Sequence, residues 1–156
     1  MTCCSLLSLA TAVPPHVIAQ GEAKALAREA FARKALFDRL AGVFDNAAIA
    51  KRHTVAPAGW YREPHGWSDR NALYLQAAEA LFEDAARSAI ERAGLAPGDI
   101  DGVVTVSTTG IATPSLEARV ATRLGLAGIP AVAEVIMVER DLRLVELTGT
   151  PYHAAH

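Results

Sequence analysis

The segment from Asp101 to Leu126 constrains the fold of this chain more than any other part. It begins with an apolar run, Val103 to Ser107, continues through a turn rich in hydroxyl groups, and becomes helical at Thr113 and Pro114. Thr is a good N-cap and Pro is accepted at the first helical position, so this pair predicts a helix start. A buried strand, a polar turn and a capped helix in succession are typical of α/β proteins, which bind ligands at the carboxyl ends of strands.

The longest helix is predicted upstream of this segment. It starts at Ser68, an N-cap candidate, and ends at about Ala93, where Gly94 follows as a stop. Apolar residues cover so wide a face of this helix that we expect it to be buried between layers. The strand Val103–Ser107 is apolar on both faces, as in a sheet that is covered on both sides.

The remaining elements are shorter. The apolar run from Ser5 to Val13, followed by Pro14 and Pro15, predicts a buried strand. Helices are predicted at residues 20–33 and 35–44, and a short strand or turn at residues 49–53. Residues 45–67 are rich in Pro, Gly and aromatic side chains, which favours an irregular loop. Beyond residue 126, the apolar runs 129–138 and 142–147 predict two more strands.

Composition excludes several classes of protein. A chain of 156 residues that is 51% hydrophobic is expected to form one domain with its own core and not to be disordered. Its formal net charge of −2 provides no field that attracts nucleic acid or an anionic membrane. The run Leu6–Val13 is too short to span a bilayer and lacks the basic start of a signal peptide. We therefore expect neither nucleic-acid nor membrane partners.

Cysteine and histidine usage indicates a reducing compartment without metal. Cys3 and Cys4 are the only cysteines, and adjacent cysteines rarely pair. The absence of a disulfide framework favours the cytoplasm, and we expect both thiols to be buried and unreactive. No histidine combines with a cysteine or carboxylate at zinc-ligand spacing, so no metal site is predicted, and His153 and His156 are expected to lie in a frayed end.

Four segments, in order, resemble a known family. They are Leu7–Gln20 (LSLATAVPPHVIAQ), Ile49–His53 (IAKRH), Asn71–Leu75 (NALYL) with Ala93–Asp101 (AGLAPGDID), and Val103–Glu117 (VVTVSTTGIATPSLE) with Arg123–Leu126 (RLGL). Together they resemble the amino-terminal part of the chalcone and stilbene synthase family, the type III polyketide synthases. The version STTGIATPS is similar to the bacterial members that make alkylpyrones or alkylresorcinols.

The resemblance implies a fold and a reaction. The fold is α/β, with residues 1–126 as the amino-terminal portion of a thiolase-like architecture of αβαβα layers and residues 127–156 as a divergent tail. The activity is that of an acyltransferase, a homodimer that loads an acyl group from acyl-CoA onto a cysteine and extends it with malonyl-CoA. Coenzyme A thioesters are then substrates, and no bound cofactor is implied.

The catalytic residues of the family have no counterparts in this chain. The family's cysteine follows soon after the segment that matches Arg123–Leu126, whereas no cysteine follows Cys4 here. The family's histidine and asparagine belong to a second half that is absent. No catalytic residue is therefore assigned, and a frame change or truncation after residue 126 is the favoured explanation, with divergence or a wrong gene boundary as alternatives.

Three threonines match substrate-contacting positions of the family. Thr108 and Thr109 match hydroxyls that line the initiation and cyclisation cavity, although local hydrogen bonds to the backbone explain them equally well. Thr113 matches a position that reaches into the cavity of the dimer partner, but its expected role as an N-cap is the stronger explanation.

One arginine matches a position that binds coenzyme A. Arg39 corresponds to a basic residue that contacts the coenzyme A phosphates in plant members. The two companion basic positions are Gly42 and Asn46 here, so most of this cluster is missing. A solvated charge on a helix is an equally good explanation of Arg39.

Three functions are consistent with these observations. The first is a type III polyketide synthase-like acyltransferase by descent, inactive by itself. The second is a non-catalytic partner of a full-length synthase subunit, and the third is a condensing enzyme similar to ketoacyl synthase III. A partial thiolase fold leaves a sheet edge and an apolar surface uncovered, so we also expect poor solubility or oligomers.

Overall fold

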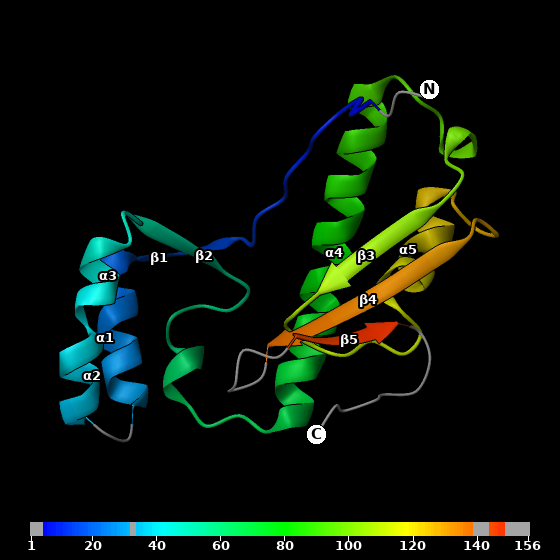
Figure 1. The fold of residues 1–156 in the computed structure, drawn as a ribbon. Helices are drawn as coiled ribbons and strands as arrows, with labels where there is room; N and C mark the ends of the chain where they lie inside the picture. Colours follow the sequence, from blue (N-terminus) through cyan, green and yellow to red (C-terminus); the bar gives the residue numbers. More distant parts are fainter. Residues whose placement is uncertain (1–4, 32–33, 139–143, 149–156) are drawn as a thin grey trace. The chain divides into compact units, whose positions relative to one another are not determined.

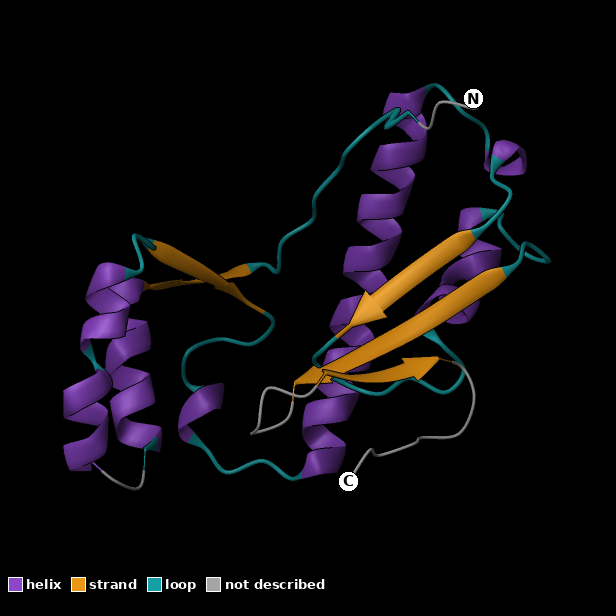
Figure 2. Cartoon of the chain, viewed as in Figure 1, coloured by secondary structure: helices purple, strands orange, loops and turns teal. Residues whose placement is uncertain are grey.

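The computed structural model describes residues 5–31, 34–138 and 144–148 as a mixture of helices and strands. Its contacts divide the chain into two compact units (Figures 1 and 2). The smaller unit is Val13–Asp69, and the larger unit combines Met1–Ala12 with Arg70–His156. None of the helices in the described ranges has both the length and the hydropathy needed to cross a membrane.

The smaller unit is an antiparallel strand pair with short helices. Strand β1 (His16–Ala19) pairs with β2 (Lys51–Thr54) in a register that places His16 opposite Thr54. The helical elements are α1 (Gln20–Ala30), α2 (Lys34–Leu40), α3 (Gly42–Asn46) and the 3₁₀ turn η1 (Trp60–Arg62). Its buried apolar residues are Ile18, Leu26, Phe37 and Ala56. Burial of one residue from nearly every element makes this unit a small core of its own.

The strand expected at Ser5–Val13 is wrong. Residues 5–14 have no strand structure, and the first strand begins at His16. An apolar run becomes a strand only where a second strand completes its hydrogen bonds, and these residues have no such partner among the described strands. Their polar contacts are instead to helix α4 (Trp67–Ala93), where the Ser8 hydroxyl donates to the Ala89 carbonyl (2.7 Å).

The larger unit is built around a three-stranded sheet. Strand β3 (Val103–Ser107) pairs in parallel with β4 (Ala131–Val138), and β4 pairs antiparallel with β5 (Leu144–Thr148). The helix α5 (Leu116–Leu124) connects β3 to β4, as a parallel pair requires, and the short turn η2 (Pro97–Asp99) precedes β3. The strands expected at 103–107, 129–138 and 142–147 are thus confirmed, within one to two residues at their ends.

The core of the larger unit lies between α4, α5 and one face of β3. It is formed by Val120, Leu124 and Leu126, against which Phe82 of α4 and Val103 of β3 pack. Helix α5 ends at Gly125, whose φ of 72° is left-handed, and the Leu126 amide then donates back to the Ala121 carbonyl (2.8 Å). This C-terminal motif turns Leu126 back into the core.

Only one face of β3 is covered, so the prediction of a sheet covered on both sides is wrong for this strand. Val103 faces the helices, whereas Val104 is 69% and Val106 56% exposed on the opposite face. Both α4 and α5 contact the same core cluster, and Figure 1 shows them behind the sheet in the same direction. An apolar sequence predicts a strand buried on both faces only where the chain supplies a layer for each face.

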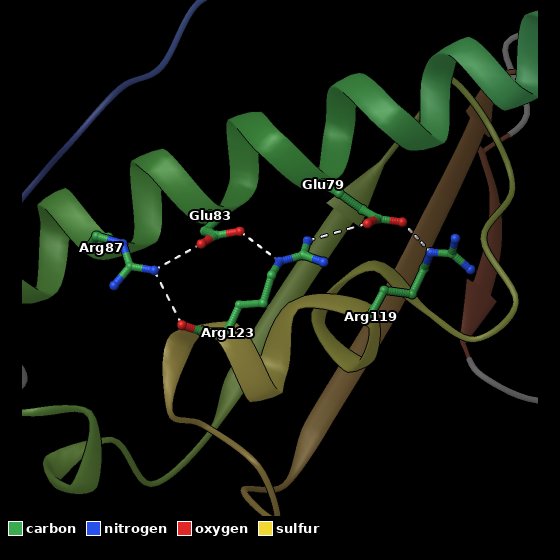
Figure 3. Close-up of polar contacts among 5 residues, drawn as sticks. All are labelled: Glu79, Glu83, Arg87, Arg119 and Arg123. Atoms are coloured by element: carbon green, nitrogen blue, oxygen red, sulfur yellow. Dashed lines mark hydrogen bonds and ion pairs between the residues drawn. The ribbon is translucent and has the colours of Figure 1, made fainter.

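Ion pairs join α4 to α5 alongside this core (Figure 3). Arg119 Nε lies 2.5 Å from a Glu79 oxygen, and Arg123 contacts both Glu79 (3.2 Å) and Glu83 (2.7 Å). Arg87 contacts Glu83 (2.8 Å) and also donates to the Arg123 carbonyl (3.2 Å). The hydrogen bond from Arg119 lowers the pKa of Glu79, and those from Arg87 and Arg123 lower the pKa of Glu83. A network of this kind fixes the relative position of two helices better than an isolated surface pair does.

Replacing Val120 with Ala is expected to destabilise the fold by about 1–3 kcal/mol, because the fully buried side chain leaves a cavity in the core. The matched control is Val104→Ala on the exposed face of β3, which should change the free energy of unfolding by less than about 0.5 kcal/mol. Urea denaturation of the two variants measures the difference. Equal losses in both variants would show that the two faces of β3 are buried alike.

Replacing Glu79 with Gln is expected to lower the melting temperature at neutral pH. Because arginines hold the pKa of Glu79 below its ordinary value of 4.5, the folded state gains stability above that value and loses it as the pH falls through the lowered pKa. Melting curves of the two proteins should therefore approach each other on acidification. Glu91→Gln, an exposed change on the same helix, is the control and should have little effect at any pH.

Candidate functional site

The candidate site lies in the loop that follows β3. Thr108 and Thr109 come directly after the carboxyl end of the strand, and Thr113 lies in the same loop before α5. All three side chains are exposed. Neither Thr108 nor Thr109 makes a side-chain hydrogen bond within the described part of the chain, so the local explanation for these two hydroxyls has no support in the structure.

The prediction that Thr113 caps the following helix is wrong. Helix α5 begins at Leu116 and its N-cap is Ser115, which has the extended backbone of a cap residue (φ −60°, ψ 160°). The segment holds two residues suited to a cap, and the second one takes the position. The Ser115 hydroxyl does not bond to the backbone of the helix and contacts the Glu117 carboxylate instead. Thr113 is therefore left without the local role that the sequence suggested.

Sequence reasoning missed a buried carboxylate beneath this loop. Glu117 is only 4% exposed, and it accepts hydrogen bonds from the hydroxyls of Thr105 (2.6 Å) and Ser115. Its spacing carried the signal, since Glu117 lies three residues before Val120 and seven before Leu124, on the inward face of α5. Glu117 ties β3 to the start of the helix, and it lines a cavity of about 320 Å³ whose other walls include Phe82 and Leu126.

Two residues near the start of α4 contact the loop from the other side. The side-chain amide of Asn71 donates to the Ile111 carbonyl (3.1 Å) and accepts from the Ile111 amide (3.1 Å). The Tyr74 hydroxyl lies 2.7 Å from the Ser107 hydroxyl at the end of β3. The sequence placed Asn71 and Tyr74 only in a helix, because nothing in the local pattern shows a contact with residues more than 30 positions away.

Arg39 lies in the smaller unit, in the last turn of α2, and is exposed. Its guanidinium has no ion pair among the described residues. Gly42 and Asn46, which take the two companion positions, are the first and last residues of α3 and add no positive charge. Arg39 is a single cation and does not form a phosphate clamp with either of them.

Other site chemistry is absent from the described residues. They contain no group of three His, Cys, Asp or Glu side chains that could hold a metal ion. They also contain no cysteine, because Cys3 and Cys4 lie outside the described ranges, as do His153 and His156. The expectations for these four residues stay predictions.

Comparison with curated proteins finds synthases of one class. The chain is 37% identical over 126 residues to 1,3,6,8-tetrahydroxynaphthalene synthase of Streptomyces peucetius subsp. caesius, which covers 78% of this chain and 33% of that protein. It is 30% identical over 125 residues to a Bacillus subtilis protein provisionally named chalcone synthase, covering 76% of this chain and 34% of that protein. The chain thus spans about a third of the length of these relatives. No family model matches it.

A shorter similarity is to a different enzyme. Over 40 residues the chain is 65% identical to dihydroorotase of Desulfotalea psychrophila, which covers 26% of this chain and 10% of that protein. The two shares of this chain, 78% and 26%, together exceed its whole length, so the two matched segments have residues in common. Sequence analysis did not detect this similarity.

Comparison with solved structures identifies the fold. Tetrahydroxynaphthalene synthase of Streptomyces coelicolor superposes with a TM-score of 0.69 at 24% identity, covering 83% of this chain and 47% of that chain. A type III pentaketide synthase of Neurospora crassa gives a TM-score of 0.74 at 19% identity, covering 85% of this chain and 36% of that chain. The partial thiolase-like fold and the resemblance to the chalcone and stilbene synthase family are therefore confirmed: the amino-terminal part of this chain is similar in sequence and in fold to the type III polyketide synthases.

Proposed function

We propose that residues 1–126 are the amino-terminal portion of a type III polyketide synthase-like acyltransferase, which condenses acyl-CoA starters with malonyl-CoA. The observation that carries this proposal is the 37% identity over 126 residues to tetrahydroxynaphthalene synthase. The hydroxyl-bearing loop after β3 supports it, because Thr108 and Thr109 lie exposed at the carboxyl end of a strand, where α/β proteins bind ligands. In this proposal Thr108, Thr109 and Thr113 line the substrate cavity, and Arg39 contributes one charge toward the coenzyme A phosphates.

This polypeptide by itself lacks the group that performs the condensation. Thioester exchange needs a thiolate nucleophile, usually one whose pKa is lowered by a neighbouring histidine or a helix N-terminus. The two cysteines of the chain precede the first strand, far in sequence from the loop after β3. The chain therefore provides part of a cavity wall, and catalysis requires a second polypeptide that carries the nucleophile.

A non-catalytic partner role is the second candidate function. The uncovered face of β3, with Val104 and Val106 exposed, favours it, since an exposed apolar face is a common feature of protein interfaces. The partner in this proposal is a full-length synthase subunit, or a second copy of this chain in a homodimer. A condensing enzyme of the ketoacyl synthase III kind is less well supported, because the relatives found are polyketide synthases.

We further infer that the divergent tail, residues 127–156, has a separate origin. The synthase match leaves about a fifth of the chain uncovered, and the family resemblance of the sequence ends at Leu126. A segment 65% identical to dihydroorotase is best placed there. A shifted reading frame produces residues unrelated to any protein, so identity at this level favours a joined segment over the frame change that the sequence suggested. A segment of about a tenth of dihydroorotase is expected to have no activity of its own.

The chain alone is expected to form no product from fatty acyl-CoA and radiolabelled malonyl-CoA, because it has no nucleophile near the proposed cavity. Tetrahydroxynaphthalene synthase of Streptomyces peucetius serves as the active control. Co-expression of a tagged chain with that synthase tests the partner role, and Val104→Asp with Val106→Asp is the matched variant that should abolish co-purification. A labelled pyrone or resorcinol from the chain alone would refute the proposed inactivity.

Sequencing of the locus and mass spectrometry of the purified protein test the origin of the tail. A joined segment predicts that the DNA continues to encode dihydroorotase-like sequence in the same frame. A frame change predicts instead that another frame, just beyond the codon for residue 126, encodes a cysteine-bearing synthase segment. Finding that segment would overturn the inference of a separate origin.

A further inference from the structure

We propose that Asn71 and Tyr74 are positioning residues that hold the loop 108–113 in the conformation that presents Thr108 and Thr109 to substrate. The inference rests on the proposed function for its ligand, an acyl-CoA, and on the geometry of the larger unit for its mechanism. Both residues lie in the first turns of α4, about 35–40 positions before the loop that they contact. Neither residue was assigned any role by the sequence.

Asn71 holds the far side of the loop at two points. Its amide nitrogen donates to the Ile111 carbonyl and its amide oxygen accepts from the Ile111 amide, each at 3.1 Å. This reciprocal pair satisfies both backbone groups of one residue, as an adjacent strand would do. A residue bonded through both its N–H and its C=O cannot rotate either peptide group without losing a hydrogen bond, so the backbone at Ile111 is fixed.

Tyr74 holds the near side of the loop. Its hydroxyl lies 2.7 Å from the Ser107 hydroxyl, and the Thr109 amide points to the same Ser107 oxygen at a longer 3.4 Å. Its ring lies so close to Gly110 that a Cβ on that residue would fall 2.3 Å from the ring carbon Cδ1. Only glycine allows the backbone to approach the ring this closely.

The two contacts leave the threonines fixed in place but unpaired. Thr108 and Thr109 lie between Ser107, which contacts Tyr74, and Gly110 and Ile111, which contact Tyr74 and Asn71. Their side chains are exposed and have no side-chain partner within the described residues. Hydroxyls on a backbone that is already ordered bind a ligand without a further loss of loop entropy, which is the advantage of a preorganised site.

Asn71→Ala separates positioning from a general structural role. Alanine favours helix more than asparagine does, so α4 and the melting temperature should be maintained while both hydrogen bonds to Ile111 are lost. Hydrogen exchange of the Ile111 amide should become about tenfold faster in the variant. Tyr74→Phe removes the hydroxyl and keeps the ring, and it should speed exchange at Thr109. Asn46→Asp and Tyr61→Phe, both in the smaller unit, are controls that should leave the loop unchanged.

Ligand binding supplies the functional readout, with lauroyl-CoA and free coenzyme A as the probes. If the loop positions Thr108 and Thr109 for the acyl thioester, Asn71→Ala should weaken lauroyl-CoA binding several-fold and leave coenzyme A binding unchanged. An unchanged rate of exchange at Ile111, or faster exchange with unchanged lauroyl-CoA affinity, overturns the positioning role. Failure of the wild-type chain to bind either probe contradicts the proposed function, and the positioning role for substrate is rejected with it even if the exchange rates change as expected.

Discussion

Packing of α4 and α5 against a single face of β3 is the constraint on which the larger unit depends. Val120 is the most deeply buried of the large side chains, and it joins Leu124 and Leu126 in the contact with Phe82 and Val103. Burial of this apolar surface supplies the stability, and the ion pairs of Glu79 and Glu83 with the arginines of α5 determine how the two helices align. The loop after β3 is held between these two helices, so its geometry follows from theirs.

The same arrangement explains what the unit leaves exposed. Both helices lie on one face of the sheet, so Val104 and Val106 on the other face have no cover. The extended segment before β1 adds Leu6 and Leu9, which are 84% and 73% exposed. Exposed apolar groups of this kind favour association, either with copies of the chain or with a complementary polypeptide. The expectation of oligomers or poor solubility therefore has a structural basis, and it stays a prediction.

The family resemblance and the site chemistry describe different parts of one machine. The chain shares sequence and fold with the amino-terminal third of type III polyketide synthases, and it retains a loop with exposed hydroxyls at the end of a strand. The cysteine that a condensation requires is not found near that loop in the sequence. The similarity of a short segment to dihydroorotase adds a second ancestry to the chain, which a single family of enzymes does not explain.

The sequence by itself determined the elements whose signals are local. The strand Val103–Ser107, the long helix ending near Ala93 and the two late strands follow from apolar periodicity, caps and glycine stops, which act within a few residues. Only the tertiary structure decided which apolar runs find a partner, why Ser115 and not Thr113 begins α5, how Glu117 is buried, and how Asn71 and Tyr74 hold the loop. The reason is physical: a strand, a buried carboxylate or a held loop is stable only when groups far apart in the chain satisfy its hydrogen bonds, and local spacing carries no information about where those groups will be.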